Sequence, residues 1–513
     1  MTPWEQHFRE RRPQHYGHHR EGNHEQQGPP GILFYCFAAV LLGAILFLGM
    51  PVAQAGPADR RYRDLFLILT GALGAVGGLL WGRMSKVRPE ERRLEDRILT
   101  AAAICLPAYA LLQCIPLPLG IVALFSPARA QLARSIEPVL GSQRFASLSV
   151  TPAATFTHFL LLAGYAVTMF AAREFAVRAR RKIWIIAAPV LAGGLLEAAL
   201  ALLQFTSPGD NIVKGTFAIR NHLAGFLEMA LPLALGFGMA ALAGARDRED
   251  GGRPNWLRIA GGLALAALIF TAGLVTLSRG GFGGIFGSLL VMAVFSAGRG
   301  MPVQRRLLIV GGLAVVVIGL LFVATPLSLI ARLAQHDSEG RLSVWGEGIN
   351  VVRAYPLVGA GLGGFESAFL KYKVAEGQFI VDYAHNDYLQ GLAELGIAGF
   401  AMVALFIGSV VVRSARMALG TADSSSSADS PEGMPIGSAE TRWAGLACLA
   451  AVVAILIHSA VDFNLYVPAN GATFAWICGM AAGLTPSHRR RRRIVEVPED
   501  LLQRPAPSYP GRR

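Results

Sequence analysis

Long apolar runs, separated by short polar segments, constrain this chain more than any other feature of its sequence. A transmembrane helix needs about 20 mostly apolar residues because it has to cross about 30 Å of hydrocarbon. About twelve runs approach that length; they begin at Gly31, Leu65, Ile98, Thr155, Ile183, Asn221, Leu257, Gly280, Arg306, His385, Trp443 and Val467. The sequence therefore predicts an all-α, polytopic membrane protein with about 12 transmembrane helices.

The composition supports one membrane domain rather than several soluble ones. Apolar residues make up 53% of the 513 residues, charged residues make up 16%, and the mean hydropathy is +0.45. A soluble domain typically carries about a quarter charged residues. We expect a polar tail at 1–30, a transmembrane domain at 31–484 in a lipid bilayer, and a basic tail at 485–513.

The positive charge is placed as in a multi-pass membrane protein. The net charge is +13, and much of the excess lies between apolar runs and in the tail from His488 to Arg493. Lys and Arg are retained on the cytoplasmic side of a membrane. This rule predicts cytoplasmic termini and one long periplasmic loop at 325–384, and we expect no nucleic-acid partner.

The first apolar run permits two interpretations. Residues 1–30 are polar and basic, and Ala53-Gln54-Ala55 resembles the cleavage site of a signal peptide. An apolar core of this length exceeds the usual one of a signal peptide, so we favour an uncleaved anchor. Cleavage would leave the rest of the topology unchanged.

Two connections differ from the short polar segments. Residues 414–442 contain the run Ser424-Ser425-Ser426-Ser427 and predict a disordered cytoplasmic linker. In the long loop, Leu342, Trp345, Ile349 and Val352 have helical spacing, which predicts an amphipathic helix at the membrane surface. The G-x-G-x-x-G match at 359–364 follows no predicted strand, so we expect its glycines to turn the loop rather than to bind a nucleotide.

Cationic and imidazole side chains collect at the predicted external ends of the helices. They are His158, His222, His336, His385, His458, Arg220, Arg279 and Arg341, together with Asp462. External arginines oppose the positive-inside rule, so the group predicts an anionic ligand such as a diphosphate. The alternative for each arginine taken alone is contact with lipid headgroups.

Other polar and sulfur-containing residues have plainer interpretations. His458 and Asp462 are spaced i, i+4, and we prefer a hydrogen bond that fixes helix orientation over a catalytic or metal role. Glu197 and Glu228 lie in apolar runs, where either could mark a proton path, and Glu228 could instead pair with an arginine. The five cysteines lie in apolar runs without ligand spacing, and we expect small core residues rather than disulfides or a metal site.

Several motifs resemble those of the O-antigen ligase family. The segment His385-Asn386-Asp387-Tyr388-Leu389 precedes Glu394-Leu395-Gly396-Ile397-Ala398-Gly399-Phe400, with Phe400 where ligases often have Thr or Val. Three further segments agree: 215–225, Ser278-Arg279-Gly280, and Arg341 with Trp345 followed by 356–361. The resemblance covers a core of about residues 151–484.

The resemblance implies a glycosyltransferase at the periplasmic face of a bacterial inner membrane. Its donor would be a glycan on undecaprenyl diphosphate, and its acceptor a hydroxyl of a glycan such as lipid A-core. It implies His385 as the general base, with Arg220, Arg279 and Arg341 on the diphosphate. Asn386, His222, Glu394, His458 and Asp462 would support them. The resemblance implies inversion at the anomeric carbon without metal or cofactor.

Other functions remain open at this stage. The same superfamily includes O-antigen and exopolysaccharide polymerases, and a non-catalytic scaffold of an export complex is conceivable. A proton-coupled transporter should carry ionisable residues near the membrane centre, often in internally repeated halves. The chain has no evident repeat, and its histidines avoid the membrane centre, which favours the enzyme.

Overall fold

The chain is almost entirely helical. The computed structural model describes residues 31–84, 94–179, 182–207, 213–246, 255–296, 304, 337–374, 380–419 and 439–484. Within these ranges the only strands are β1 (Leu117–Pro118) and β2 (Phe145–Ala146), which pair antiparallel. The predicted helical membrane fold is therefore confirmed apart from this short pair.

Eight helices in the described ranges are long and apolar enough to cross a membrane. They are α4 (Leu94–Cys114), α8 (Pro152–Arg178), α9 (Trp184–Thr206), α10 (Arg220–Arg246), α11 (Trp256–Val275), α12 (Arg279–Ser296), α17 (Asp387–Leu419) and α18 (Ala439–His458). The structure thus supports a multi-pass membrane protein, with fewer spanning helices described than the twelve expected. The run predicted from Arg306, and His336, lie outside the described residues.

Three more of the predicted runs form helices of a different kind. Helices α2 (Ile32–Phe47) and α19 (Pro468–Gly483) have 16 residues each. Such a helix measures about 24 Å, which is shorter than the hydrocarbon layer of about 30 Å. Helix α3 (Pro57–Met84) is longer, but its first two turns are rich in Asp and Arg. These helices explain most of the difference from the predicted number.

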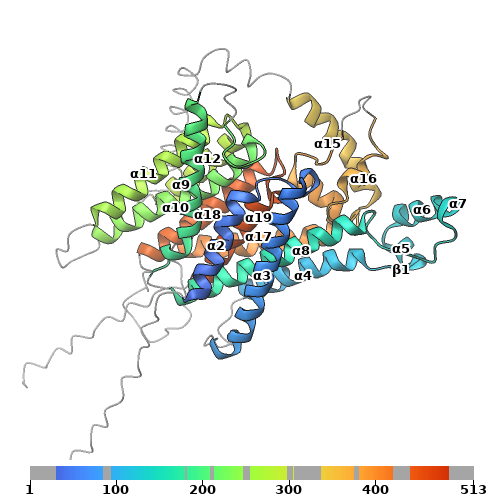
Figure 1. Cartoon of the computed structure of the whole chain (residues 1–513), viewed down its shortest axis with the longest axis horizontal. Coiled ribbons are helices and arrows are strands. Elements are labelled where there is room, and N and C mark those ends of the chain that lie inside the picture. The colour runs from blue at the N-terminus through green and yellow to red at the C-terminus, as the bar shows by residue number, and fades with distance from the viewer. Residues whose placement is uncertain are drawn as a thin grey trace, which may run out of the picture.

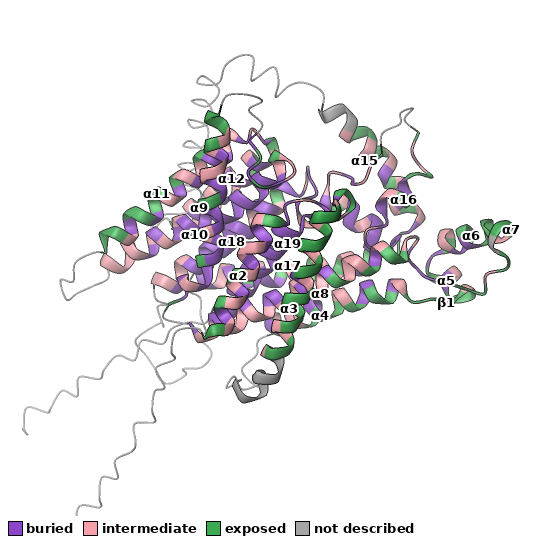
Figure 2. Ribbon diagram, viewed as in Figure 1, coloured by how far each residue is buried: buried purple, intermediate pink, exposed green. Residues whose placement is uncertain are grey.

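The core of the bundle is formed by α10, α18 and α19 (Figures 1 and 2). Every residue of α19 is buried, and α10 and α18 are mostly buried. Helix α2 packs against α19 and α9 through Phe34, Phe37, Leu41 and Ile45. The first apolar run is therefore part of the core.

Two ion pairs join the start of α4 to the last turns of α17. The buried guanidinium of Arg413 binds Asp96 and donates to the carbonyls of Ala481 and Leu484, and Arg416 pairs with Glu95. Helix α17 extends to Leu419 and α18 begins at Ala439. Both ends of the predicted 414–442 linker are thus helical, and residues 420–438 lie outside the described ranges.

The cysteines do not all lie in the core. Cys448 and Cys478 are buried as expected, but Cys105 is exposed on α4. The prediction of core residues was therefore wrong for Cys105, because an apolar run contains a lipid-facing side as well as a buried one.

An irregular unit lies at one end of the bundle, beside the start of α17 (Figure 1). It contains α15 (Asp337–Ala354) and α16 (Phe365–Phe369) from the long loop. The other half follows α4 and consists of β1, β2, α5 (Leu119–Phe125), α6 (Pro127–Ser135) and α7 (Glu137–Leu140). Val358 of the loop packs with Val122 and Ala130, so the two halves share a core. The sequence analysis did not anticipate this second half.

The helix expected in the loop is present as α15, and two residues of its predicted apolar stripe are exposed. Leu342 is 62% exposed and Ile349 is 43% exposed, whereas Val351 is fully buried. Helix α15 packs against α16 and α17. The apolar spacing predicted the correct element, and the position of its exposed apolar stripe at a membrane surface stays a prediction.

The predicted topology can be tested at Ser367, which is exposed on α16. We expect Ser367→Cys, in a Cys114→Ser background, to react with a membrane-impermeant thiol reagent in cells whose outer membrane has been permeabilised. Labelling of Ser367→Cys only after lysis would reverse the predicted orientation.

Candidate functional site

Helix α17 is broken near its start, and the long loop docks on the break. At Gly396 the backbone leaves the helical conformation, with φ 61° and ψ −174°. The amide of Ile397 donates to the carbonyl of Pro356 at 2.9 Å, and the amide of Ala360 donates to the carbonyl of Ala393 at 2.8 Å. The loop thus satisfies backbone groups that the interrupted helix cannot, as a buried backbone requires.

The glycine-rich segment 359–364 provides the turn that this docking requires. Gly359, Gly361 and Gly363 have φ values of 74°, 100° and 74°. Residues with a β-carbon rarely adopt such values. The expectation that these glycines turn the loop is confirmed.

Glu394 binds the end of this turn from inside α17. Its buried carboxylate accepts the amides of Gly363 at 2.8 Å and Phe365 at 3.1 Å, and the hydroxyl of Tyr466 at 2.7 Å. Glu394 was expected to support the site. Its contacts are with the loop and Tyr466 rather than with His385, so a role in the site stays a prediction.

Helix α4 closes the same junction from its other side. The amide of Gln113 donates to the carbonyls of Val358 at 2.8 Å and Glu394 at 3.0 Å. The hydroxyl of Tyr109 lies 3.0 Å from the carbonyl of Val358 and 2.9 Å from that of Leu395. The loop, α4 and α17 therefore form one hydrogen-bonded body.

His385 lies just before α17, and its backbone is held on both sides. Its φ of 49° is unusual for a residue with a side chain. The carbonyl of the preceding Ala384 accepts the indole N–H of Trp345 at 2.8 Å, and its amide donates to Gln390 at 2.9 Å. Helices α15 and α17 thus fix the strained backbone conformation that orients the imidazole of His385.

The imidazole of His385 is bound to the buried carboxylate of Asp462. His385 Nδ1 lies 3.2 Å from Oδ1 of Asp462, and the side chain of His385 remains 35% exposed. Because an ionised carboxylate only accepts, Nδ1 carries the hydrogen and donates it. Nε2 then keeps a free electron pair, and it has no hydrogen-bond partner among the described residues.

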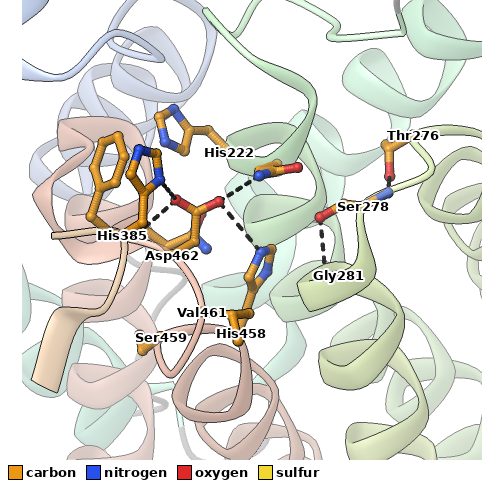
Figure 3. Close-up of polar contacts among 12 residues, drawn as sticks. His222, Thr276, Ser278, Gly281, His385, His458, Ser459, Val461 and Asp462 are labelled. Carbon is orange, nitrogen blue, oxygen red and sulfur yellow. Dashed lines mark hydrogen bonds and ion pairs between the residues drawn. The ribbon is translucent and has the colours of Figure 1, made fainter. Parts of the chain in front are cut away.

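Asp462 is the centre of the polar cluster drawn in Figure 3. It also accepts the side-chain amide of Asn221 at 2.6 Å and the backbone amide of Phe463 at 3.0 Å. Burial by itself would raise the pKa of the Asp462 carboxyl, but the bond from His385 and the nearby histidines outweigh burial and lower that pKa. Asp462 is thus held ionised beside His385.

Aromatic rings line this cluster on one side. The ring of Phe463 stacks on Tyr383 with centroids 4.2 Å apart, and it meets His385 and His222 edge-on at 4.8 and 4.9 Å. His222 is fully buried, and neither of its ring nitrogens has a partner among the described residues. The structure thus brings His222 next to His385.

The predicted hydrogen bond between His458 and Asp462 is not formed. Nε2 of His458 lies 4.0 Å from Oδ2 of Asp462, whereas Nδ1 lies 3.0 Å from Glu228. Helix α18 ends at His458, so Asp462 lies in the following turn and the i, i+4 spacing no longer places both on one helical face. The alternative partner proposed for Glu228, an arginine, is likewise wrong, because Glu228 pairs with His458.

Two other polar residues have structural partners. Asn386 accepts the amides of Tyr388 and Leu389, each at 3.0 Å, so it caps α17 directly after His385. Glu197 accepts the amide of Thr216 at 3.1 Å and its hydroxyl at 2.6 Å. Glu197 therefore holds the loop before α10 rather than lying free in the membrane.

The three predicted arginines gather around the 458–462 turn. Arg341 donates to the carbonyl of Val461 at 2.7 Å. Arg220 begins α10 next to Asn221, which binds Asp462. Arg279 begins α12, where a β-carbon added at the following Gly280 would lie 2.2 Å from Cδ2 of His458.

Arg220 and Arg279 are also exposed, and neither has a hydrogen bond or ion pair within the described part of the chain. Each stands at the N-terminus of a helix, where backbone amides favour an anion. The cluster therefore combines two available cations with an oriented imidazole. Within the described ranges, no three His, Cys, Asp or Glu residues are arranged to hold a metal ion.

Comparison with known families agrees with this arrangement. Residues 262–404 match the family model described as O-antigen ligase. This segment of the chain is similar to the O-antigen ligase family. No curated protein is significantly similar to the chain. Enzymes of the O-antigen ligase family are membrane glycosyltransferases.

The O-antigen ligase match contains only part of the site. Arg279, Arg341 and His385 lie inside it, whereas Arg220 and Asp462 lie outside. Helices α10 and α18 bring the outside residues to the matched ones. The residue that orients His385 could not have been assigned from the matched segment alone.

The junction between the loop and α17 can be tested at Gly396. A β-carbon there would lie 2.5 Å from the carbonyl oxygen of Leu357, and a positive φ costs a residue with a side chain about 1–3 kcal/mol. We expect Gly396→Ala to lower the thermal unfolding midpoint in detergent by several degrees. The matched control is Gly408→Ala in the same helix, where no atom lies within 4 Å. Equal midpoints for the two variants would contradict this role of Gly396.

Proposed function

We propose that this protein transfers a glycan from undecaprenyl diphosphate to a hydroxyl of an acceptor glycan at the periplasmic face of the bacterial inner membrane. The observation that carries the proposal is the pair formed by His385 and Asp462. Asp462 binds Nδ1 and leaves Nε2 free, beside two exposed arginines that have no partner in the described ranges. This combination is suited to activating a hydroxyl next to an anionic leaving group.

His385 would act as the general base. Nε2 takes the proton from the acceptor hydroxyl while its oxygen bonds to the anomeric carbon of the donor sugar. The bond from that carbon to the diphosphate oxygen breaks, and undecaprenyl diphosphate leaves with the electron pair. Asp462 stabilises the resulting imidazolium through the bond to Nδ1. A direct displacement of this kind inverts the anomeric centre, and it requires no metal ion.

Arg220, Arg279 and Arg341 would bind the diphosphate. A diphosphate is already a good leaving group, so the site needs charge stabilisation more than acid catalysis. The guanidinium group suits this task because its planar donors match two phosphate oxygens at once. Arg341 has one donor committed to Val461 and retains others for the ligand.

A purified-protein assay tests the proposal. We expect the protein to transfer glycan from a lipid-diphosphate donor to an added acceptor, in the presence of a chelator. A transporter or scaffold would give no product under these conditions.

The second candidate function is a polymerase of the same superfamily. The polysaccharide made by a deletion strain distinguishes it from a ligase. Loss of capped lipopolysaccharide with retained polymer indicates a ligase, whereas accumulated single repeat units indicate a polymerase.

Of the two exposed arginines, Arg279 is the more informative because it lies within the family match and Arg220 does not. We expect Arg279→Ala to abolish transfer and weaken donor binding at a normal protein level. Arg279→Lys should restore transfer only in part, because a point charge does not reproduce the two-pronged contact. Full transfer by both variants would return Arg279 to a lipid-headgroup role.

His385 provides the direct test of the base. We expect His385→Ala to reduce turnover by about 10²–10⁴-fold with donor binding nearly intact. The turnover of the wild-type protein should fall as the pH drops through the titration of an imidazole, because only the neutral ring accepts a proton. His385→Gln keeps a hydrogen-bond donor but no base. Near-normal turnover of His385→Gln, with the same pH dependence, would exclude His385 as the base.

A further inference from the structure

A second pair of histidine and carboxylate lies behind the first. Nδ1 of His458 is 3.0 Å from Oε2 of Glu228, and Nε2 of His458 is 4.0 Å from Oδ2 of Asp462. The side chains of His458, Glu228 and Asp462 are at most 1% exposed. Asp462 therefore has an imidazole on each side: His385 at Oδ1 and His458 facing Oδ2 (Figure 3).

The position of His458 determines which of its nitrogens carries hydrogen. Nε2 has no hydrogen-bond partner in the described part of the chain, and the carboxylate of Asp462 faces it. A bare Nε2 would direct its electron pair at an anion inside a protein, where repulsion is strong. Nε2 therefore carries a hydrogen. This holds whether the proton between Nδ1 and Glu228 rests on the ring or on the carboxyl.

We propose that His458, held in place by Glu228, is a positioning residue that limits how strongly Asp462 favours the protonated form of His385. A carboxylate bonded to an imidazole stabilises the imidazolium. A protonated ring cannot take the acceptor proton, so this stabilisation works against His385 as a base. The N–H of His458 also interacts electrostatically with this carboxylate, from the other side. That interaction weakens the stabilisation of the His385 imidazolium, so Asp462 can orient His385 while the ring remains able to accept a proton.

Packing around His458 supports a fixed position. A β-carbon at Gly280 of α12 would lie 2.5 Å from Nε2 of His458, and one at Gly284 would lie 2.3 Å from Oε2 of Glu228. Both glycines are on the same face of α12. Helix α12 therefore approaches the pair so closely that only hydrogen fits between them, and neither side chain has room to turn away.

Other charged groups also face this cluster and must stay constant in a test. They are His222 on α10, Asp387 at the start of α17, Arg279 at the start of α12, and Arg341 of α15, which binds Val461. Asp387 is fixed by Ser459, whose hydroxyl donates to it at 2.6 Å. None of these side chains bonds to His458, so a substitution of His458 leaves their contacts in place.

The test is the pH profile of transfer by His458→Leu. The proposal rests on the proposed role of His385, whose protonation is expected to produce the acid limb of the wild-type profile. Leucine has no N–H to face Asp462, so His385 becomes easier to protonate and the acid limb should move to higher pH, by about one unit. An unchanged acid limb would overturn the proposal, whatever the maximum rate.

Two further variants keep the outcome interpretable. Glu228→Gln with His458→Leu leaves no unpaired buried carboxylate, and it should move the acid limb in the same direction even where the single variant folds poorly. Ile455→Ala removes a buried apolar side chain one turn earlier in α18. It should lower stability or rate without moving the acid limb. A similar movement for Ile455→Ala would reduce His458 to a packing role and overturn the proposal.

Failure of this proposal differs from failure of the proposed function. If His385→Gln keeps both full transfer and the acid limb, His385 is not the base, and the role of His458 falls with it although transfer itself stands. If the wild-type protein transfers no glycan in the purified assay, the proposed function fails. If His385→Gln abolishes transfer but both His458 variants keep the wild-type acid limb, only the role of His458 fails.

Discussion

The carboxylate of Asp462 is the interaction on which the rest of the site depends. An ionised group inside an apolar bundle is tolerated only when donors surround it. Here they come from three parts of the chain: Asn221 of α10, His385 before α17, and the turn after α18. Satisfying Asp462 therefore fixes how these helices meet, and it holds the N-terminus of α10, where Arg220 lies, beside His385.

A second constraint acts on the backbone rather than on a side chain. The break of α17 at Gly396 exposes amide and carbonyl groups to an apolar surrounding, where each must find a partner. The long loop and α4 supply these partners. Asp462 and the break thus constrain the same helix. Helix α17 contains the break at Gly396, and His385, which binds Asp462, lies just before its first residue.

Much of the membrane fold could be predicted from apolar run length, because the hydrocarbon layer imposes that length directly. The partners of the charged residues could not be predicted from the sequence. The i, i+4 spacing predicted a hydrogen bond between His458 and Asp462. Helix α18 ends at His458, however, and His458 pairs with Glu228 of α10 instead. Asn386 looked like a site residue and is a helix cap. The roles of Glu394 and Gln113 depend on contacts between distant segments, which no local pattern contains. His385, Arg341 and the starts of α10 and α12 do lie around the 458–462 turn, since residues at the same end of adjacent helices lie close together. Their roles stay predictions.

The attachment of the loop has a consequence for how substrates reach His385. Trp345 of α15 binds the carbonyl next to His385, and residues 356–365 are bonded to α4 and α17. Swinging this part of the loop outward would pull the imidazole out of alignment and break the helix junction. The docked loop is therefore a fixed frame for His385, and a ligand has to reach Nε2 of His385 while residues 356–365 stay bonded to α4 and α17.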